Sequence, residues 1–279
     1  MASYHRPREL GDALAVLREG AITVIAGGTD YYPARVERPA NEDLLDITAI
    51  SALRRIDITS GHFRIGAGVT WTDLIRADLP PCFDGLKLAA REIGGVQIQN
   101  AGTLAGNVCN ASPAADSMPN LLALDTEVEL ASTQGQRRLK LGDFVTGNRK
   151  TLRRPDELVT ALLIPRRLEA SRSSFVKLGA RRYLVISIVM LAAVMEKQEG
   201  KVAAARIAVG ACSEVARRLP ALERALLGRP WDRTLAAVIE PSHLAGLSPI
   251  DDVRAGAAYR RDAAQVLLRR ALEALGEAA

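Results

Sequence analysis

Cysteine and histidine are scarce in this 279-residue sequence, which has three of each. The cysteines, Cys82, Cys109 and Cys212, are far apart, and none belongs to a C-x-x-C pair. This spacing argues against an iron–sulfur cluster, a structural zinc site or a disulfide framework within the chain. The histidines are equally dispersed, so the sequence predicts no metal site. We also identify no catalytic residue.

Long apolar runs are missing too. The longest, at residues 183–195 (YLVISIVMLAAVM), is shorter than the ~20 residues that a membrane-spanning helix needs. In residues 1–20 the apolar positions follow helical spacing and are interrupted by charge, unlike the continuous apolar segment of a signal peptide. The sequence therefore predicts a cytoplasmic protein without a membrane span.

Charge is not concentrated in long runs of one sign. The net charge is +5, but the basic residues are scattered as pairs such as Arg137-Arg138 and Arg217-Arg218. Scattered pairs are typical of a solvated surface and not of a continuous basic stripe. We therefore expect no nucleic-acid partner.

Two patterns of secondary structure follow each other along the chain. Up to about residue 165, short apolar strands alternate with amphipathic helices. The segments SSFVKLGA, VISIVMLAAVMEK and KVAAARIAVGAC then predict three consecutive strands, the last two joined in an antiparallel hairpin across residues 198–200. A final helix is predicted over residues 257–277, and the domain boundary in residues 164–174 (IPRRLEASRSS).

Two glycine segments carry the main functional signal. Residues 26–30 (AGGTD) directly follow a predicted buried strand, and residues 102–107 (GTLAGN) repeat the combination of glycine, threonine and a polar residue. Such glycines can simply turn the chain. Consecutive main-chain N–H groups without bulky side chains can also form a concave anion site. Two such segments in one domain favour a dinucleotide ligand.

Other nucleotide-binding motifs match less well. Residues 66–71 (GAGVTW) resemble the start of a nicotinamide-binding Rossmann fingerprint, but Trp71 stands where the third glycine should be. A tryptophan there would block the close packing of helix on strand that this fold needs. No Gly-Lys-Ser/Thr triplet occurs, which argues against a P-loop.

The ordered motifs AGGTD, GTLAGN, SPAAD, GNRKT and PDELV followed by IP resemble the FAD-binding subunit of the molybdenum hydroxylases, the group of xanthine dehydrogenase and carbon monoxide dehydrogenase. The closing segment at residues 248–275 is also similar to that family. The resemblance covers essentially the whole chain.

The resemblance implies an α+β protein of two domains. Residues 1–167 would form an FAD-binding domain of the vanillyl-alcohol oxidase (PCMH) type, itself of two subdomains. Residues 168–279 would form a domain like the C-terminal domain of the carbon monoxide dehydrogenase flavoprotein, with a three-stranded antiparallel sheet and helices.

The resemblance also implies an oxidoreductase subunit that binds FAD noncovalently. Electrons would arrive from the two [2Fe–2S] clusters of a small partner subunit and leave through FAD to an acceptor. A large partner subunit would carry the molybdopterin cofactor and oxidise the substrate. The heterotrimer would be doubled, as an (αβγ)2 assembly.

The positions that match the family's FAD contacts are Ala26, Gly27, Gly28, Thr29, Asp30, Ile93, Thr103, Leu104, Ala105, Gly106, Asn107, Asp116, Val159 and Lys177. By this resemblance, residues 26–30 would bind the pyrophosphate and residues 103–107 would line the other side of the cofactor. Lys177 would stabilise the reduced, anionic flavin; the alternative is a solvated lysine on a strand. For Asp116 the alternative is an interaction with a helix dipole, and Cys109 is expected to be a small core residue.

Two positions depart from the family's pattern. Relatives often have glycine where this chain has Ala105, a change that is tolerable if φ there is negative. Many have an acidic residue after the lysine motif, where this chain has Val185. The acceptor therefore stays open between NAD⁺, O₂ and another carrier. A stand-alone flavin reductase or oxidase of the same fold, and a scaffold protein that only kept the fold, are the alternative functions.

Overall fold

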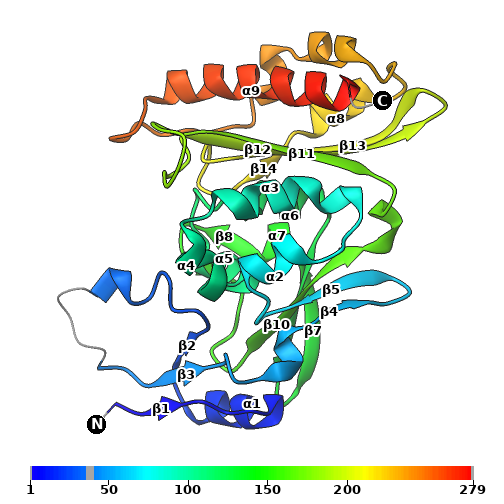
Figure 1. Ribbon diagram of the computed structural model, residues 1–279. Coiled ribbons are helices and arrows are strands. Elements are labelled where there is room, and N and C mark those ends of the chain that lie inside the picture. Colours follow the sequence, from blue (N-terminus) through cyan, green and yellow to red (C-terminus); the bar gives the residue numbers. More distant parts are fainter. Residues whose placement is uncertain (1, 36–40, 278–279) are drawn as a thin grey trace.

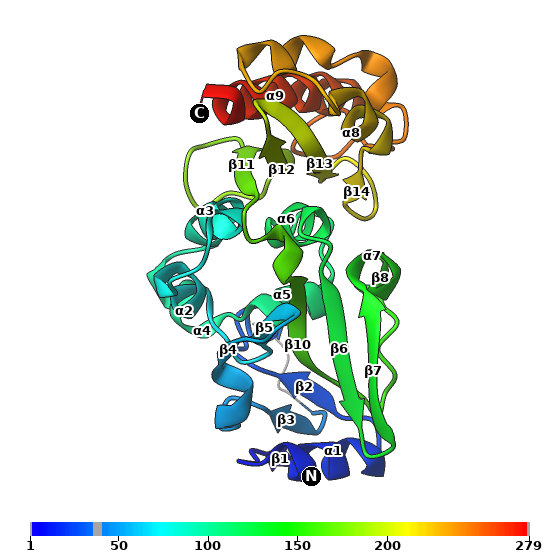
Figure 2. The ribbon, with the colours of Figure 1, turned by 90° about the vertical axis from the view of Figure 1, so that its right-hand side faces the viewer.

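The computed structural model describes residues 2–35 and 41–277. The chain forms three tiers, with the N-terminus in the lowest and the C-terminal helix in the highest (Figure 1, Figure 2). Between these ends, the middle tier combines an antiparallel sheet with a group of short helices.

The lowest tier is a small parallel sheet in the order β1-β3-β2. Its strands are β1 (Tyr4–His5), β2 (Thr23–Ile25) and β3 (Leu44–Asp46), and helix α1 (Leu10–Glu19) connects the first two. Helix α1 buries Ala13, Leu14 and Leu17 and ends at Gly20, as the sequence pattern predicts. Strand β2 ends directly before the glycine segment at residues 26–30.

The middle tier contains a five-stranded sheet in the order β4-β5-β10-β6-β7. All its neighbours are antiparallel, so the fold is not a Rossmann fold. Trp71 is buried at the start of α2, whose N-cap Thr70 forms a reciprocal capping box with Asp73. The strands are β4 (Ile56–Ile58), β5 (His62–Gly66), β6 (Glu127–Ser132), β7 (Gly135–Lys140) and β10 (Leu158–Pro165).

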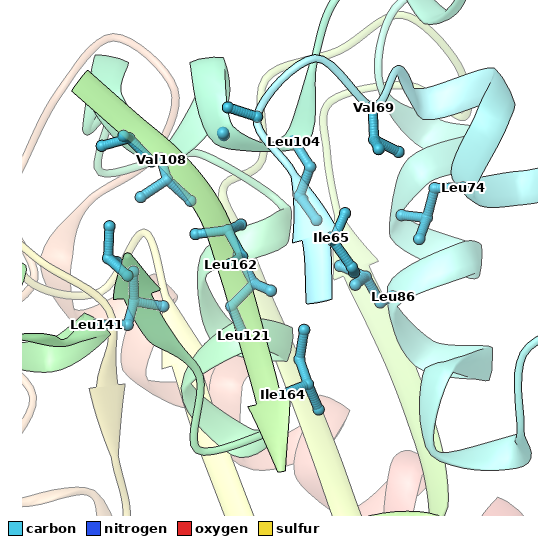
Figure 3. Packing of buried hydrophobic residues seen from close by; sticks show 14 of the residues in the cluster. Ile65, Val69, Leu74, Leu86, Leu104, Val108, Leu121, Leu141, Leu162 and Ile164 are labelled. Carbon is cyan, nitrogen blue, oxygen red and sulfur yellow. The ribbon is translucent and has the colours of Figure 1, made fainter. Parts of the chain in front are cut away.

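Short helices share one hydrophobic core with this sheet. Figure 3 shows Leu104 and Val108 from α5 among Leu162 and Ile164 of β10. The helices are α2 (Trp71–Arg76), α3 (Asp84–Glu92), α4 (Val96–Ala101), α5 (Leu104–Asn110), α6 (Ser117–Ala123) and α7 (Leu141–Phe144). A two-stranded hairpin of β8 (Val145–Gly147) and β9 (Lys150–Thr151) follows α7.

The highest tier is built on the sheet β11-β12-β13-β14. The strands β11 (Arg172–Leu178), β12 (Val189–Gln198) and β13 (Lys201–Gly210) are consecutive and antiparallel, as predicted. The structure adds a fourth strand of two residues, β14 (Arg217–Arg218), which the sequence analysis missed because so short a strand has no periodicity. Helices α8 (Pro220–Leu226) and α9 (Ala257–Glu277) follow.

Strand β12 is apolar on both sides because both faces of this sheet are covered. Met190, Ala192 and Val194 belong to the core of the middle tier. Their neighbours along the strand, Val189, Leu191, Ala193 and Met195, belong to a second core that includes the buried face of α9. The alternation follows from the two-residue period of a strand. It explains the continuous apolar run in the sequence.

Short 3₁₀ turns complete the chain: η1 (Pro33–Arg35), η2 (Ser51–Arg54), η3 (Pro81–Phe83), η4 (Arg166–Leu168), η5 (Arg233–Val238) and η6 (Pro241–Leu244). Among the described residues, no helix combines the length and the apolar character that crossing a membrane requires.

Candidate cofactor-binding site

The glycine segment at residues 26–30 leaves strand β2 as a half-buried loop. Gly28 has φ +64°, and a Cβ there would meet the ring of Tyr32 at 2.5 Å. Within the described part of the chain, no protein acceptor takes a hydrogen bond from the main-chain N–H groups of Gly27, Thr29 or Asp30, nor from that of Gly28. A row of free N–H donors without bulky side chains fits a phosphate group.

The two glycine segments are in contact through their main chains. A Cβ at Gly27 would lie 1.8 Å from the carbonyl oxygen of Ala101, and one at Gly102 would lie 3.1 Å from Oγ1 of Thr29. From the sequence alone, the approach of a cofactor accounts for these small residues. At Gly27 the structure gives a different reason, because the space that a side chain would need is filled by the protein's own main chain.

The second glycine segment, which was expected to offer main-chain donors like the first, is instead largely the start of helix α5. Thr103 is the N-cap of α5, and its side-chain oxygen accepts a hydrogen bond from the N–H of Gly106 at 2.9 Å. The N–H of Leu104 donates to Val69, and that of Asn107 to Thr103. Most donors of this segment are therefore used within the protein. Ala105 lies inside the helix and has a negative φ, so alanine is tolerated there.

Asp116 and Lys177 form a buried ion pair. Nζ of Lys177 lies 2.7 Å from Oδ2 of Asp116, and the two side chains are 9% and 7% exposed. Oγ of Ser187 donates to Oδ1 of Asp116 at 2.5 Å, and Nζ of Lys177 also donates to the carbonyl of Val185 at 3.2 Å. Burial raises the pKa of Asp116 above its ordinary value, while the ammonium and the hydroxyl oppose that rise.

This pair corrects two interpretations that the sequence left open. Lys177 is not a solvated strand lysine, because its side chain is almost fully buried. Asp116 is the N-cap of α6, yet its side chain makes no capping hydrogen bond and is turned to Lys177 instead. The hydrogen bonds of this carboxylate go to Lys177 and Ser187 and not to the main chain of α6.

Ile93 and Val159 occupy different surroundings from these polar residues. Ile93 is the half-buried C-cap of α3. Val159 is 2% exposed within β10, next to a register shift between residues 159 and 161. Its side chain belongs to the hydrophobic core, so only its main chain could contact a ligand.

Several polar residues that the sequence analysis did not single out join the predicted ones. Ser117 donates to Oδ1 of Asn107 at 2.6 Å. Arg149 donates to Oδ2 of Asp30 at 3.0 Å, and Ser187 contacts Asp116. Arg149 lies in the motif GNRKT, so the sequence did offer a signal that this residue belongs to the site. Ser187 had none, because only the fold brings it to Asp116.

The thiols are packed in apolar surroundings. Burial raises the pKa of Cys82 to about 12 and the pKa values of Cys109 and Cys212 to about 11. Thiols with such pKa values stay protonated and unreactive at neutral pH. Cys109 packs against the core of the middle tier, as expected. The described residues contain no group of three or more His, Cys, Asp or Glu that could hold a metal ion.

The α+β fold presents a donor-lined glycine loop of the kind that suits an anionic ligand such as a nucleotide cofactor. Residues 1–167 match the family described as the FAD binding domain in molybdopterin dehydrogenase, and residues 174–275 match the CO dehydrogenase flavoprotein C-terminal domain. The chain belongs to the FAD-binding medium subunits of the molybdenum hydroxylases, of the xanthine and CO dehydrogenase type. It is thus a subunit of an oxidoreductase complex, and the α+β architecture inferred from the sequence is confirmed.

Individual relatives cover nearly the whole chain. The putative xanthine dehydrogenase FAD-binding subunit of Escherichia coli is 29% identical over 97% of this chain and 94% of its own length. The 6-hydroxypseudooxynicotine dehydrogenase complex subunit alpha of Paenarthrobacter nicotinovorans is 30% identical over 93% and 89%. Among solved structures, reconstituted CO dehydrogenase from Oligotropha carboxidovorans has a chain with a TM-score of 0.91 at 28% identity, covering 100% of this chain and 99% of that one.

Proposed function

We propose that this chain holds FAD noncovalently and conducts electrons from the [2Fe–2S] clusters of a small partner subunit to an external acceptor. A large partner subunit with the molybdopterin cofactor completes the heterotrimer, which is doubled. The observation that carries this proposal is the full-length similarity, over both domains, to medium subunits of such complexes. The free N–H donors of the glycine loop support it independently.

The residues of the chain divide into two groups with different tasks. The main-chain donors of residues 27–30 would bind the pyrophosphate, because no acceptor among the described residues takes their hydrogen bonds. The ion pair of Asp116 and Lys177 would lie along the cofactor and fix the local electrostatics. When bound, FAD supplies a centre that accepts single electrons and delivers pairs, while the protein supplies position and charge.

The acceptor depends on the loop after β11. There Val185 offers an apolar side chain, and its carbonyl is occupied by Lys177. The loop thus presents no carboxylate at this position, in contrast to the acidic residue that sequence analysis expects in many relatives. The proposal covers NAD⁺, O₂ or another carrier, and comparing the rates of reduction of these acceptors by the purified complex separates them.

Noncovalent binding is tested by acid precipitation of the flavin-loaded protein. We expect FAD in the supernatant and a colourless pellet, because the chain holds the cofactor through hydrogen bonds and charge. Flavin that stays with the precipitated protein would show a covalent link and contradict this part of the proposal.

A further inference from the structure

Arg149 occupies a backbone conformation that does not suit an arginine. It lies at the tip of the β8–β9 hairpin with φ +55°. Glycine and asparagine adopt this left-handed region most readily, whereas a side chain with a Cβ is strained there. A strained residue persists only where the surrounding structure holds it in place, and such residues gather at functional sites.

The contacts that hold Arg149 connect three segments that are distant in sequence. Its Nη1 donates to Oδ2 of Asp30 at 3.0 Å and to Oδ1 of Asn110 at 2.5 Å. Its main-chain N–H donates to the carbonyl of Ala111 at 3.0 Å. The hairpin, the glycine loop and the end of α5 therefore meet at one guanidinium group.

Global stability does not account for this arrangement. The side chains of Arg149 and Asp30 are 60% and 54% exposed, and exposed ion pairs contribute little to folding because water and salt screen them. Asp30, however, is the last residue of the donor-lined loop. A free carboxylate at that position would repel an anionic ligand on the loop.

We propose that Arg149 is a positioning residue of the cofactor site, which neutralises Asp30 and anchors the glycine loop to α5. The inference rests on the proposed function, since the ligand of the loop is the pyrophosphate of FAD. It adds a residue that acts through Asp30 and not by contact with the cofactor.

The decisive variant is Arg149→Gly, because glycine adopts the observed φ without strain. FAD affinity is measured by titrating FAD into the deflavinated full-length chain, purified from its native source with any subunits that accompany it. We expect binding at least roughly tenfold weaker, the scale of a lost charge-assisted hydrogen bond. The melting temperature of the flavin-free protein should not fall.

Glu199→Gly is the matched control. Glu199 is an exposed charged residue at the tip of the β12–β13 hairpin, with φ +50°. Its replacement relieves the same kind of strain away from the glycine loop, so FAD affinity should stay unchanged. Arg149→Lys keeps the charge without the forked geometry and should restore part of the affinity.

Two further readouts separate positioning from a structural role. Higher salt should reduce the deficit of Arg149→Gly, because it screens the repulsion between Asp30 and the phosphates. Adding Asp30→Ala to Arg149→Gly should recover at least about threefold of the lost affinity, since the two residues are coupled.

Additive losses would overturn the inference, as would an Arg149→Gly protein that binds FAD like the unmodified chain. An unmodified chain without FAD affinity would overturn the proposed function itself, and this inference with it.

Discussion

The charged side chain of Lys177 is buried beside the carboxylate of Asp116, which compensates its charge. The pair is held at 2.7 Å, with Ser187 on the second carboxylate oxygen. A buried pair of this kind contributes little net stability, but removing one partner leaves the other charge uncompensated. Each residue therefore depends on the other.

Replacing Lys177 by methionine should destabilise the protein by about 3–5 kcal/mol at neutral pH, the usual cost of breaking a buried pair. Chemical denaturation measures this change. Adding Asp116→Asn should recover most of the loss, whereas Lys201→Met, at an exposed lysine that begins β13, should have little effect.

The FAD-loaded Lys177→Met protein should also show a lower flavin midpoint potential, because a positive charge has been removed. An unchanged potential would contradict a role for Lys177 in tuning the flavin.

The pH dependence of that variant follows from the raised pKa of Asp116. Without the ammonium the folded-state pKa rises further, so the folded state holds the proton more tightly than the unfolded state does. The loss of stability of Lys177→Met relative to the unmodified protein should be small below the ordinary Asp pKa of 3.8. It should grow as the pH rises through the folded-state pKa. A deficit of equal size at all pH values would exclude an uncompensated carboxylate as its cause.

Motif resemblance pointed to Lys177 and Asp116 but not to their pairing. The two residues are 61 positions apart, and Asp116 and Ser187 are 71 apart. No local pattern encodes such contacts, since they arise only when the C-terminal sheet packs on α6 through β12 and β13. The contact between Arg149 and Asp30, which spans 119 positions, was hidden for the same reason.

At the scale of elements, the glycine loop packs closely against the α4–α5 connection because Gly27 and Gly102 have no side chains at the contact. Gly27→Ala would place a Cβ 1.8 Å from the carbonyl of Ala101 and force the segments apart. Overpacking of this kind costs ~1–3 kcal/mol, and we expect FAD affinity to fall at least about tenfold with an unchanged far-UV circular dichroism spectrum. Gly11→Ala is the control, because a Cβ at Gly11 meets nothing within 4 Å. Stoichiometric flavin retention by Gly27→Ala would contradict the assigned loop.

Helix α9 depends on a buried arginine near its start. Arg260 is 3% exposed and donates to the carbonyls of Ile188 and Ala211 and to Asp252. Hydrogen bonds, first from the N–H of Arg254 and then from the Arg260 guanidinium, lower the pKa of Asp252 from 3.8 to about 2.

Asp252→Asn should therefore reduce stability at neutral pH by roughly 1–3 kcal/mol, the value of a hydrogen bond to a charged group. Because the folded-state pKa is depressed, this contribution is present above 3.8 and disappears as the pH falls through about 2. Thermal unfolding across this range should show the two proteins converging in acid. Asp262→Asn, on an exposed position of α9, should match the unmodified protein throughout.

Sequence periodicity was sufficient for elements with a strong local signal. It predicted α9 and the three long strands of the C-terminal sheet. It did not reveal the helix at residues 104–107, where glycine and other small residues interrupt the apolar pattern. There Thr103 caps a helix, and a cap outweighs the weak helix propensity of Gly106.

At the scale of the whole molecule, α6 ties the two predicted domains together. Asp116 at its start contacts Lys177 and Ser187, and Asp125 after its end accepts from Arg206 and Arg218. Residues of β11 and β12 also enter the core of the middle tier. The C-terminal domain thus contributes Lys177 and Ser187 to the candidate site, although the domain boundary in residues 164–174 stays a prediction.

The central claim is that this chain is the flavin-bearing member of a larger electron-transfer complex. Purifying a tagged full-length copy from its native source and analysing subunits, flavin, iron and molybdenum tests it most directly. We expect one large and one small partner subunit, one acid-releasable FAD per copy of this chain, and both metals in the complex. A chain that purifies alone, free of metal, and oxidises a substrate by itself would contradict the claim and favour a stand-alone flavoenzyme. A complex without flavin would contradict it as well.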